Sequence, residues 1–396
     1  MPIRILVYDS DAFGHHTEFI EYFLDFLEDN SETSYHISFI LNKNTLDELR
    51  DRIFQFKKQK LNVVFIPIDN QWQNKFDNST STFTRSLLEK KYLEGLFIQY
   101  QIVNIVFLQI DIFQFVIGSW NFSKFKNIKI SGILFEPYVQ EPLTNFSIFF
   151  KKIRKRLQLN WMFLNKNIER VFIFNDDKAV EKLNSYTEFG TKFKYLPDPI
   201  KSRSFNKINI REQYNITNSK KVLLFIGGVQ RRKNITVILE AVSLLNKQQS
   251  ENVCLLILGK CSDKELLDEI DNKISNISNC QVIFDDKRLT NDELESSIVD
   301  ADLAFVVYSN FYCSSGILGN IAKHNKYLIA SNMGVIGEVT RKYNLGNTVN
   351  PNEVSEIKIA IVNFLSSANA FTNINNNAFV KEHTHIKFAE QLLSLK

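Results

Sequence analysis

Cysteine, tryptophan and methionine are all scarce in this chain of 396 residues, which contains four, three and three of them. The cysteines lack the paired spacing that a metal site needs. Cys254 lies within an apolar run, and reduced thiols in a cytoplasmic protein are the simplest interpretation. We therefore expect no metal centre among the four, which are Cys254, Cys261, Cys280 and Cys313.

Net charge is also small, at +4, which argues against a chain that binds nucleic acid over its whole surface. No apolar run is long enough to span a bilayer. The chain begins with a strand-like run, residues 3–8, so we expect no signal peptide. Its length exceeds what one hydrophobic core usually fills, and two domains are expected.

The most informative feature that is present is the segment 225–233, Phe-Ile-Gly-Gly-Val-Gln-Arg-Arg-Lys. It continues a branched apolar run that is typical of a buried strand, and it precedes the helical apolar pattern of residues 235–245. Glycines let a backbone approach a ligand, and cations at a helix start favour an anion such as phosphate. The structural alternative is a solvated basic turn between a strand and a helix.

Further apolar runs alternate with helical patterns downstream of this segment, at residues 253–258, 282–284 and 302–307. Such alternation predicts a parallel sheet, in which ligands bind at the carboxyl ends of the strands. We expect the residues at these ends to face one crevice; they are Gly227, Gly259, Arg288 and Tyr308.

This part of the chain resembles the nucleotide-sugar half of GT-B glycosyltransferases of the retaining family-4 type. The resemblance covers residues 222–352 well and the N-terminal half more loosely. Gly227 and Lys233 match the family's phosphate loop, whereas Gly228 stands where the family has arginine. Arg231 or Arg232 could supply that missing cation.

The family's Glu-x7-Glu motif is absent, because Tyr312 and Asn320 occupy its two positions. The Ser-Ser-Gly-Ile-Leu-Gly form of the segment 314–319 is similar to a divergent branch of bacterial surface-polysaccharide transferases. The family's strand is matched by residues 326–331, and its downstream pattern is matched by Gly334, Glu338, Gly346 and Pro351.

The resemblance implies an α/β fold of GT-B architecture, with two Rossmann-like parallel-sheet domains that face a cleft. We expect an acceptor domain at residues 1–196 and a nucleotide-sugar domain at residues 200–379, with a C-terminal helix at about 380–396 that packs back onto the first. The segment 196–200, which holds two prolines, is the expected linker.

In the expected first domain, strand-like runs occur at residues 36–41, 63–68, 102–108, 130–135 and 170–174, and residues 69–91 are interpreted as loop plus helix. The loop after residues 3–8 contains Gly14, His15 and His16. A histidine there could donate to a phosphate or move a proton near neutral pH, and His16 is the catalytic candidate. Two polar residues at a helix start are the alternative.

Glu136 follows the run 130–135 and is the second catalytic candidate, as an acceptor contact or a base. The alternative, to which we give equal weight, is that Glu136 is simply a charged residue at the end of a strand before a proline. Asp111, past the run 102–108, receives less weight, and Asp9 and Asp11 are interpreted as caps of the first helix.

Ser314 and Ser315 precede an apolar helix, for which they are good N-caps. The amides of Gly316 and Ile317 at that helix start also suit a pyrophosphate or a donor sugar. Asn320 could hydrogen-bond a ribose or sugar hydroxyl where the family uses a carboxylate.

The basic run 151–156 lies among large aromatic residues. We favour a solvated helix whose aromatic face packs on its domain, and keep as the alternative a peripheral contact with an anionic membrane at its inner face.

The sequence thus predicts a metal-independent, retaining glycosyltransferase that needs no cofactor and moves a sugar from a nucleotide-sugar donor to a glycan or lipid-linked acceptor. A non-catalytic binding subunit of a polysaccharide assembly and a sugar-nucleotide epimerase are the alternatives. The expected donor phosphate and sugar contacts are Gly14, Gly228, Arg232, Lys233, Ser314, Ser315, Gly316 and Ile317. The expected nucleotide contacts are Gly259, Lys260, Arg288 and Asn320.

Overall fold

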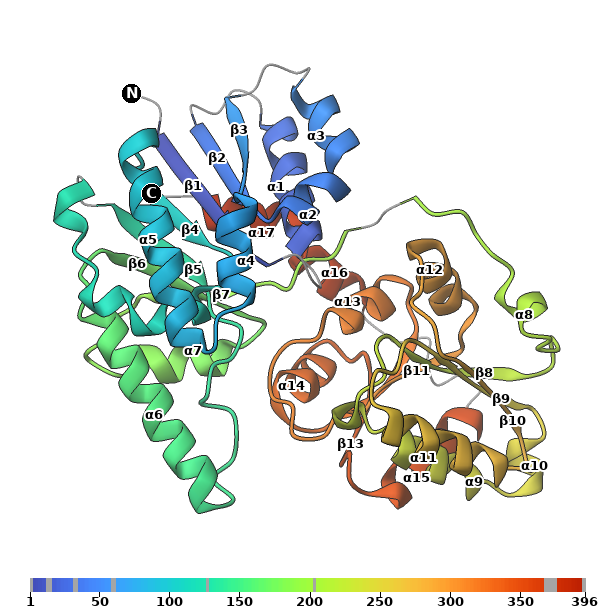
Figure 1. Cartoon of the computed structure of the whole chain (residues 1–396). Coiled ribbons are helices and arrows are strands. Elements are labelled where there is room, and N and C mark those ends of the chain that lie inside the picture. Colours follow the sequence, from blue (N-terminus) through green and yellow to red (C-terminus); the bar gives the residue numbers. More distant parts are fainter. Residues whose placement is uncertain are drawn as a thin grey trace. The chain divides into compact units, whose positions relative to one another are not determined.

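The computed structural model describes residues 3–11, 16–30, 35–57, 62–125, 128–201, 204–366 and 376–393. The chain forms two compact units (Figure 1). One comprises Met1–Pro197 together with His385–Lys396, and the other comprises Asp198–Thr384. Two expected site residues, Gly14 and His15, lie outside the described part of the chain.

The first unit is built on a seven-stranded sheet in the order β3-β2-β1-β4-β5-β6-β7, and every neighbouring pair is parallel. Side chains of successive residues in β1 point alternately into two apolar layers, so both faces of the sheet are covered. The strands are β1 (Ile3–Asp9), β2 (Tyr35–Leu41), β3 (Val63–Pro67), β4 (Asn104–Phe107), β5 (Lys129–Ile133), β6 (Ile168–Phe174) and β7 (Phe193–Leu196).

Helices on both faces of this sheet supply the remaining core. The helix at the end of the chain, α17, packs on α1, where the rings of Phe388 and Phe19 lie 5.0 Å apart between centroids. The helices are α1 (His16–Asp29), α2 (Lys43–Glu48), α3 (Arg50–Lys57), α4 (Asn70–Asp77), α5 (Thr82–Tyr100), η1 (Ile110–Phe115), η2 (Ile117–Ser119), η3 (Phe122–Phe125), α6 (Phe146–Phe163), α7 (Asp177–Asn184) and α17 (His385–Leu393).

The second unit repeats this plan with a six-stranded parallel sheet in the order β10-β9-β8-β11-β12-β13. Alternate residues of β8 again point into two apolar layers. The strands are β8 (Lys221–Ile226), β9 (Val253–Leu258), β10 (Gln281–Asp285), β11 (Leu303–Val306), β12 (Tyr327–Ser331) and β13 (Gly346–Val349). The helices are α8 (Ile210–Gln213), η4 (Arg231–Lys233), α9 (Ile235–Ser243), α10 (Lys247–Ser250), α11 (Lys264–Ser275), α12 (Asn291–Asp300), α13 (Gly316–Lys323), α14 (Gly334–Lys342), α15 (Val354–Ser366) and α16 (Asn376–Glu382).

Two parallel sheets with helices confirm the expected α/β fold class. Several boundaries differ from the sequence-based expectation. The polar segment 69–91 holds two helices, because Asp69 and Ser81 each accept a hydrogen bond from the first turn of the helix that follows. The strand expected at residues 130–135 ends at Ile133, so Glu136 lies in the loop beyond it.

A close approach of two backbones joins the ends of β8 and β9. The amide of Gly227 donates to the carbonyl of Leu258, and the amide of Val229 donates to that of Lys260. Gly259 has a φ of +148°, and a Cβ there would lie 2.2 Å from the carbonyl oxygen of Gly227. Only glycine fits at this position without moving the loop that follows β8.

Replacing Gly259 by alanine should therefore destabilise the protein by roughly 1–3 kcal/mol, through backbone strain and the clash with Gly227. The melting temperature should fall by about 2–4 °C per kcal/mol. Gly228→Ala is the matched control, since a Cβ there meets nothing nearer than 4.0 Å. Differential scanning calorimetry of both variants checks this, and equal melting temperatures would contradict it.

Candidate active site

Lys233 lies over the glycine turn at the end of β8. Its Nζ would be 3.2 Å from a Cβ built on Gly227, and it lies 5.5 Å from the ring centroid of Tyr308. No carboxylate of the described residues lies within ion-pair distance of this ammonium group. Burial, together with the smaller effect of the neighbouring Arg232 cation, lowers the pKa of Lys233 to about 8. A half-buried cation without a counterion is suited to an anionic ligand.

Arg232 is the second cation of this turn. Its guanidinium lies 4.5 Å from the ring centroid of Phe311, and its Nε donates to the side chain of Gln230. Its backbone carbonyl accepts from the amide of Ser309, which ties the turn to the segment after β11. Within the described residues, Arg232 also has no carboxylate partner.

Arg231 behaves differently, because it points toward α11. It forms ion pairs with Asp263 at 2.9 Å, with Glu269 at 3.4 Å and with Glu265 at 3.5 Å. Its charge is thus compensated on the protein surface. The sequence left open which arginine replaces the one missing after Gly227, and the structure favours Arg232.

The start of α13 belongs to the same end of the sheet. Ser314 donates from its hydroxyl to Asp198 at 2.6 Å. Ser315 occupies the N-cap position, but its side chain accepts no hydrogen bond from the helix. Simple capping, the structural explanation weighed for these serines, is therefore wrong for Ser315. The amides of Gly316 and Ile317 lie at a helix start that no side chain caps.

The four expected nucleotide contacts differ in their exposure and in their ion pairing. Lys260 forms an ion pair with Asp286 at 2.8 Å, whereas Arg288 is exposed and has no ion-pair partner among the described residues. Asn320 lies on α13, and its side-chain oxygen is 3.5 Å from Nζ of Lys323. Gly259 is constrained by packing on Gly227, so its backbone conformation has a structural explanation independent of any ligand.

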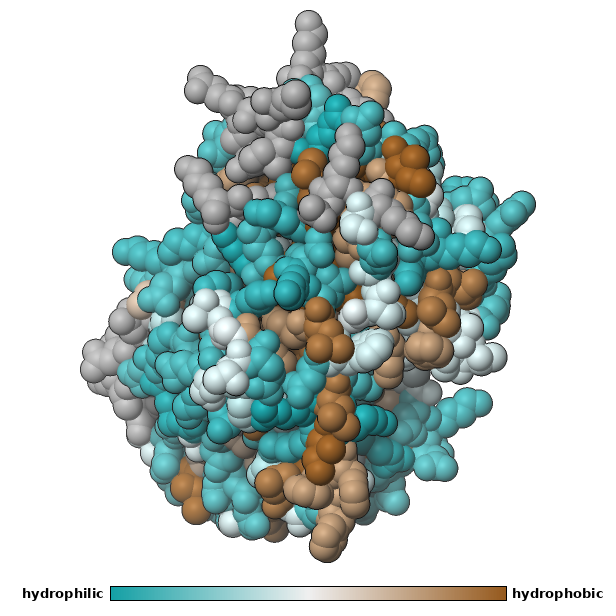
Figure 2. Space-filling view, turned by 90° about the vertical axis from the view of Figure 1, so that its left-hand side faces the viewer, coloured by the Kyte–Doolittle hydropathy of each residue, from teal (hydrophilic) through white to brown (hydrophobic). Residues whose placement is uncertain are grey.

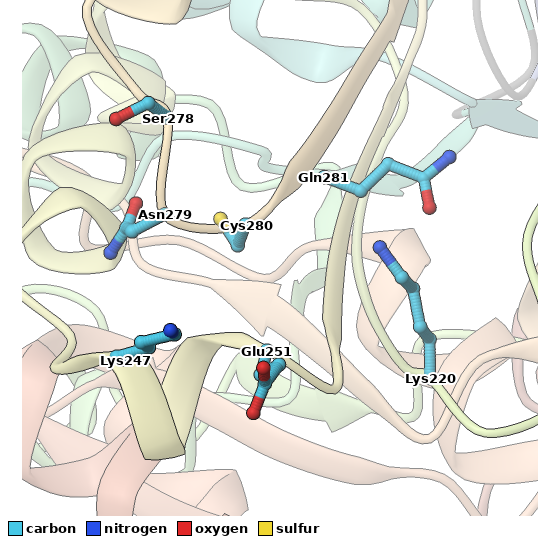
Figure 3. A pocket seen from close by; sticks show the side chains of 7 residues that line it. All are labelled: Lys220, Lys247, Glu251, Ser278, Asn279, Cys280 and Gln281. Atoms are coloured by element: carbon cyan, nitrogen blue, oxygen red, sulfur yellow. The ribbon is translucent and has the colours of Figure 1, made fainter.

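A hollow of about 680 Å³ lies elsewhere on the second unit (Figure 3). It adjoins the residues that begin β8 and β10, which is the amino end of the sheet. Ligands of parallel sheets bind at the opposite end, so we do not assign this hollow to the site. Its lining consists of Lys220, Lys247, Glu251, Ser278, Asn279, Cys280 and Gln281.

The first unit contains a cavity of about 740 Å³ at the carboxyl ends of its strands. Both catalytic candidates, His16 and Glu136, line it, and so does Asp111. The aromatic rings of Phe83, Phe115 and Phe135 contribute apolar surface. Arg154, Lys155 and Gln158 of α6 form part of the wall. This mixture of carboxylates, cations and aromatic rings suits a polyhydroxylated ligand.

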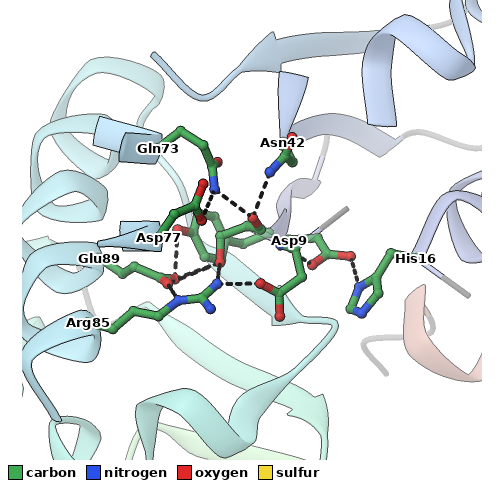
Figure 4. Close-up of polar contacts among 10 residues, drawn as sticks. Asp9, His16, Asn42, Gln73, Asp77, Arg85 and Glu89 are labelled. Atoms are coloured by element: carbon green, nitrogen blue, oxygen red, sulfur yellow. Dashed lines mark hydrogen bonds and ion pairs between the residues drawn. The ribbon is translucent and has the colours of Figure 1, made fainter. Parts of the chain in front are cut away.

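His16 opens α1 and is held by a buried carboxylate. Its Nδ1 lies 2.5 Å from Oδ2 of Asp9, which is 4% exposed (Figure 4). Burial raises the pKa of Asp9, and the hydrogen bond with His16 opposes that rise. Asp9 therefore orients the imidazole rather than capping the helix as we expected.

A polar network fixes the loop on the other side of Asp9. Arg85 donates to Glu89 at 2.6 Å, to Asp11 at 2.5 Å and to Ser10 at 2.9 Å (Figure 4). Glu89 is fully buried and also accepts from the hydroxyl of Tyr8. Asp11 thus pairs with Arg85, and its expected role as a helix cap is wrong. Burying so many polar groups requires that each one finds a partner.

Asp111 is the site residue that sequence reasoning weighted least. Its Oδ2 accepts from the amide of Phe135 at 2.9 Å, whereas its Oδ1 is buried and accepts no hydrogen bond from the described residues. Burial raises the pKa of Asp111 to about 6, against the effect of the Phe135 amide. A carboxyl with such a pKa beside a cavity is a proton-transfer candidate. Its position in η1, which packs under the cavity, is a tertiary feature that no sequence spacing signals.

Glu136 is a weaker candidate than the sequence suggested. Its side chain is 73% exposed and lies 3.6 Å from Nζ of Lys155. A solvated carboxylate paired with a lysine has little of the desolvation that tunes catalytic acids. Glu136 lines the cavity and can contact a ligand there, but Asp111 is better placed for proton transfer.

The described residues contain no cluster of three or more His, Cys, Asp or Glu side chains arranged to hold a metal ion. They also include no helix that is both long and apolar enough to cross a membrane.

The sequence of the second unit matches a known family. Residues 206–381 match the family described as Glycosyl transferases group 1. Residues 206–381 thus form a glycosyltransferase domain. The matched segment covers η4 and the start of α13, so the uncompensated cations lie within the family domain. No curated protein matches the chain in sequence.

Solved structures resemble the chain over almost its whole length. WaaG, a glycosyltransferase involved in lipopolysaccharide biosynthesis, superposes with a TM-score of 0.65 at 12% identity, covering 99% of this chain and 100% of its own. Sucrose-phosphate synthase from Thermosynechococcus elongatus gives 0.69 at 13% identity, with coverage of 99% and 97%. HepE from Anabaena, in complex with UDP and glucose, gives 0.68 at 12%, with 98% of both chains covered. These similarities confirm the GT-B fold.

The raised pKa of Asp111 predicts how the free energy of unfolding depends on pH. The carboxyl binds its proton more tightly in the folded protein, so its contribution to the free energy of unfolding decreases as pH rises from 3.8 to about 6. Asp111→Asn should remove this decrease and so raise the free energy of unfolding by roughly 1–2 kcal/mol at pH 7. This range is smaller than the full pKa shift implies, because the cavity is open to solvent. Urea denaturation at pH 4.5 and pH 7 measures both effects.

Asp47→Asn, at an exposed carboxylate, is the control and should leave the pH dependence unchanged. A pH dependence that is the same for Asp111→Asn and the wild type would show that Asp111 ionises in the folded protein as it does in the unfolded chain.

Proposed function

We propose that this enzyme transfers a sugar from a nucleotide-sugar donor to a hydroxyl group of a glycan or a lipid-linked acceptor, with retention of anomeric configuration, in surface polysaccharide synthesis. The observation that carries the proposal is the pair Lys233 and Arg232. Both cations lie at the carboxyl end of a parallel sheet, and neither has a carboxylate partner among the described residues. The diphosphate of a nucleotide sugar carries negative charge, which would neutralise these two cations.

The second unit would hold the donor. The diphosphate would contact Lys233, Arg232 and the backbone of Gly228, and the amides of Gly316 and Ile317 would bind a phosphate or sugar oxygen. The serines before α13, Ser314 and Ser315, would complete this side. HepE, which has the same fold, was solved with UDP and glucose, and this supports a uridine nucleotide as the first donor to test. The proposed nucleotide contacts remain Gly259, Lys260, Arg288 and Asn320.

Charge stabilisation by protein groups would make the reaction metal-independent and free of a cofactor. When the bond from the anomeric carbon to the phosphate breaks, negative charge grows on the departing diphosphate. Two cations and a helix start are preorganised for that charge. Lys233 would interact most strongly with this growing negative charge. Its lowered pKa indicates an ammonium group that is shielded from solvent and has no counterion among the described residues.

The first unit would hold the acceptor in the cavity of about 740 Å³. The acceptor hydroxyl would donate its hydrogen bond to the buried Oδ1 of Asp111, and His16, oriented by Asp9, would contact a neighbouring hydroxyl or phosphate oxygen. The acceptor oxygen bonds to the anomeric carbon as the phosphate leaves. Its proton passes to Asp111 or to the departing phosphate, so charge is conserved.

A role in polysaccharide synthesis is supported by two observations. The segment 314–319 is similar to surface-polysaccharide transferases, and WaaG, named for lipopolysaccharide biosynthesis, shares the fold over the whole chain. Retention is supported by the resemblance to the retaining family-4 type.

The decisive experiment is a thermal-shift screen of nucleotide sugars and nucleoside diphosphates, followed by a transfer assay with the donor that binds. Proton NMR of the product gives its anomeric configuration. Binding without transfer or donor hydrolysis would favour a binding subunit, and conversion of the donor sugar to its epimer would favour an epimerase. An inverted product would exclude the retaining mechanism.

Lys233→Ala should weaken binding of the nucleoside diphosphate by about 1.5–3 kcal/mol, the range for hydrogen bonds to charged groups. Arg231→Ala removes a cation only two residues away, but one whose charge is already compensated by Asp263 and its neighbours. It should change affinity by less than about 0.5 kcal/mol. Isothermal titration calorimetry measures both variants. Equal losses would mean that the loop attracts the ligand by general charge, without a specific site.

His16→Ala should lower turnover more than donor affinity, since the second unit would hold the donor. A loss of about a hundredfold is expected if His16 moves a proton, and His16→Asn should then restore almost nothing. If hydrogen bonding alone matters, His16→Asn should recover part of the rate. His36→Ala, at an exposed histidine, is the control. Turnover of His16→Ala within twofold of wild type would leave His16 as a plain helix-start residue.

A further inference from the structure

Three glutamine side chains line the cavity of the first unit. Gln109 precedes η1, Gln114 lies within η1 and Gln158 lies on α6. None of the three amide groups forms a hydrogen bond with a described residue, and Gln109, at the N-cap position of η1, does not cap that helix. An amide in this state can both donate to a ligand and accept from it.

Gln114 is the most unusual of the three, because the residue is only 3% exposed. Buried side-chain amides in proteins are normally hydrogen-bonded, since an unpaired polar group destabilises the folded state. Neither amide atom of Gln114 belongs to the enclosed polar atoms that lack a partner, so the exposed part of the residue includes its amide, at the cavity wall. Within the described residues, the fold thus holds this amide in place and leaves its hydrogen bonds to a ligand of the cavity.

The two other amides lie on elements that are fixed against each other. In Gln109 the amide oxygen is enclosed without a partner among the described residues, so the nitrogen is the atom that reaches the cavity. Gln158 is half-buried on α6. The indole N–H of Trp161, also on α6, donates to the carbonyl of Phe115 in η1 at 2.9 Å. This hydrogen bond joins α6 to η1, and it therefore keeps the glutamines of the two elements in a constant arrangement.

The outward face of α6 is a separate surface. Phe146, Phe150 and Trp161 lie on this helix and are 83%, 65% and 44% exposed. Their exposure contradicts the interpretation we favoured from sequence, in which the aromatic face of the helix packs on its own domain. Figure 2 views the side of the molecule on which α6 lies, and a band of apolar surface there is bordered by hydrophilic surface. The cavity wall uses other residues of the helix, among them Gln158.

Aromatic rings supply the apolar part of the cavity wall. Phe83, in the first turn of α5, is 49% exposed. Its ring meets that of Phe115 edge to face, with 5.9 Å between the centroids, and both residues line the cavity. A ring held in this way offers a surface for the C–H face of a sugar, while amides bind the hydroxyl groups around the edge of the sugar ring. Fixed amides beside an exposed aromatic ring are thus suited to a carbohydrate.

The charged residues of the cavity wall balance one another. Besides His16, which pairs with Asp9, three cations and three carboxylates line the cavity. Two of these cations form ion pairs with two of the carboxylates, and the remaining arginine and aspartate carry opposite charges at neutral pH. An anionic ligand would therefore meet no excess of positive charge here, in contrast to the turn that holds Lys233. The six charged residues are Arg85, Arg154, Lys155, Asp11, Asp111 and Glu136.

We propose that Gln109, Gln114 and Gln158 bind the hydroxyl groups of the acceptor, and that the acceptor presents a neutral sugar residue to this cavity. The inference rests on the proposed function and narrows its acceptor class. Hydroxyl groups both donate and accept, as amides do, whereas a phosphate or carboxylate group requires donors only. Gln114 contributes most to this specificity, because burial fixes its position and its amide has no partner among the described residues.

The test is saturation-transfer NMR of the full chain with UDP present. The neutral probes are the methyl glycosides of glucose and galactose. The anionic probes are the methyl glycosides of glucuronic acid and galacturonic acid, which differ from the neutral ones by a carboxylate group. At least one neutral probe should bind, and neither uronic acid should bind more tightly than its neutral counterpart.

Gln114→Met, which keeps the length of the side chain and removes its hydrogen bonds, should weaken binding of the neutral probe by about tenfold. Its melting temperature should equal or exceed that of the wild type, because the substitution removes a buried polar group without a partner among the described residues. A side chain that serves only the fold would give a lower melting temperature and unchanged binding. Gln55→Met, at an exposed glutamine on α3 outside the cavity, is the matched control and should bind as the wild type does.

Equal binding of the neutral probe by Gln114→Met and the wild type would overturn the proposal. So would tighter binding of a uronic acid than of its neutral counterpart, or a wild type that binds UDP and neither neutral probe. Loss of neutral-probe binding in Gln114→Met, in a protein that binds no nucleoside diphosphate, would support the sugar subsite and count against the proposed donor function alone.

Discussion

The contact between the backbones of Gly227 and Gly259 is the constraint on which the proposed donor site in the second unit depends. It brings the end of β8 against the end of β9 at a distance that excludes any side chain. The chain then has to turn immediately into η4, and Lys233 lies over Gly227 as a result. Arg232, held by the carbonyl contact with Ser309, faces the aromatic rings after β11. Two cations are thus kept close together by geometry, and no carboxylate of the described residues lies within ion-pair distance of either.

The two units hold their charges in opposite ways. In the first unit, Asp9 is paired with His16, and Arg85 satisfies both Glu89 and Asp11. The buried Oδ1 of Asp111 has no hydrogen-bond partner among the described residues, and neither has the buried side-chain oxygen of Gln73. In the second unit, Lys233 and Arg232 have no carboxylate partner among the described residues, although Arg231 and Lys260 nearby are paired. This difference agrees with the proposed roles, in which the first unit would position hydroxyl groups and the second would bind an anion.

Much of the framework could be predicted from the sequence, because buried parallel strands are apolar runs bounded by glycine. β8 and β9 follow this rule, and their ends were located correctly. β7 and β13 were not predicted as strands: each has four residues, and β13 begins Gly-Asn-Thr, which carries no apolar signal. Both lie at sheet edges, where hydrogen bonding to one neighbour is enough.

The site was less predictable, because its chemistry depends on partners distant in sequence. Arg231 and Arg232 are adjacent and alike, and only the position of Asp263 on the neighbouring helix start separates them. The burial of Asp111 was not predicted, because it depends on how η1 packs in the fold, and the exposure of Glu136 was not predicted, because it depends on the loop that carries it. The aromatic residues of α6 looked like core by their spacing, since a helix face that packs and one that is exposed have the same period.

The two glutamates of the retaining family-4 motif are missing from the proposed donor site, and their absence would change its charge balance. Tyr312 and Asn320 stand at their positions, and the backbone of Tyr312 instead packs against Gly334, where a Cβ would lie 2.6 Å from its Cα. Asn320 contacts Lys323, whose ammonium group pairs with the buried Glu295, and α13 itself contains no acidic residue. In the proposed site, the two cations would attract the diphosphate by charge, and the amide of Asn320 would recognise hydroxyl groups only by hydrogen bonding. Discrimination between donor sugars would then depend on the shape of the site rather than on carboxylate contacts, because hydrogen bonds to a neutral amide are weaker than those to a charged group.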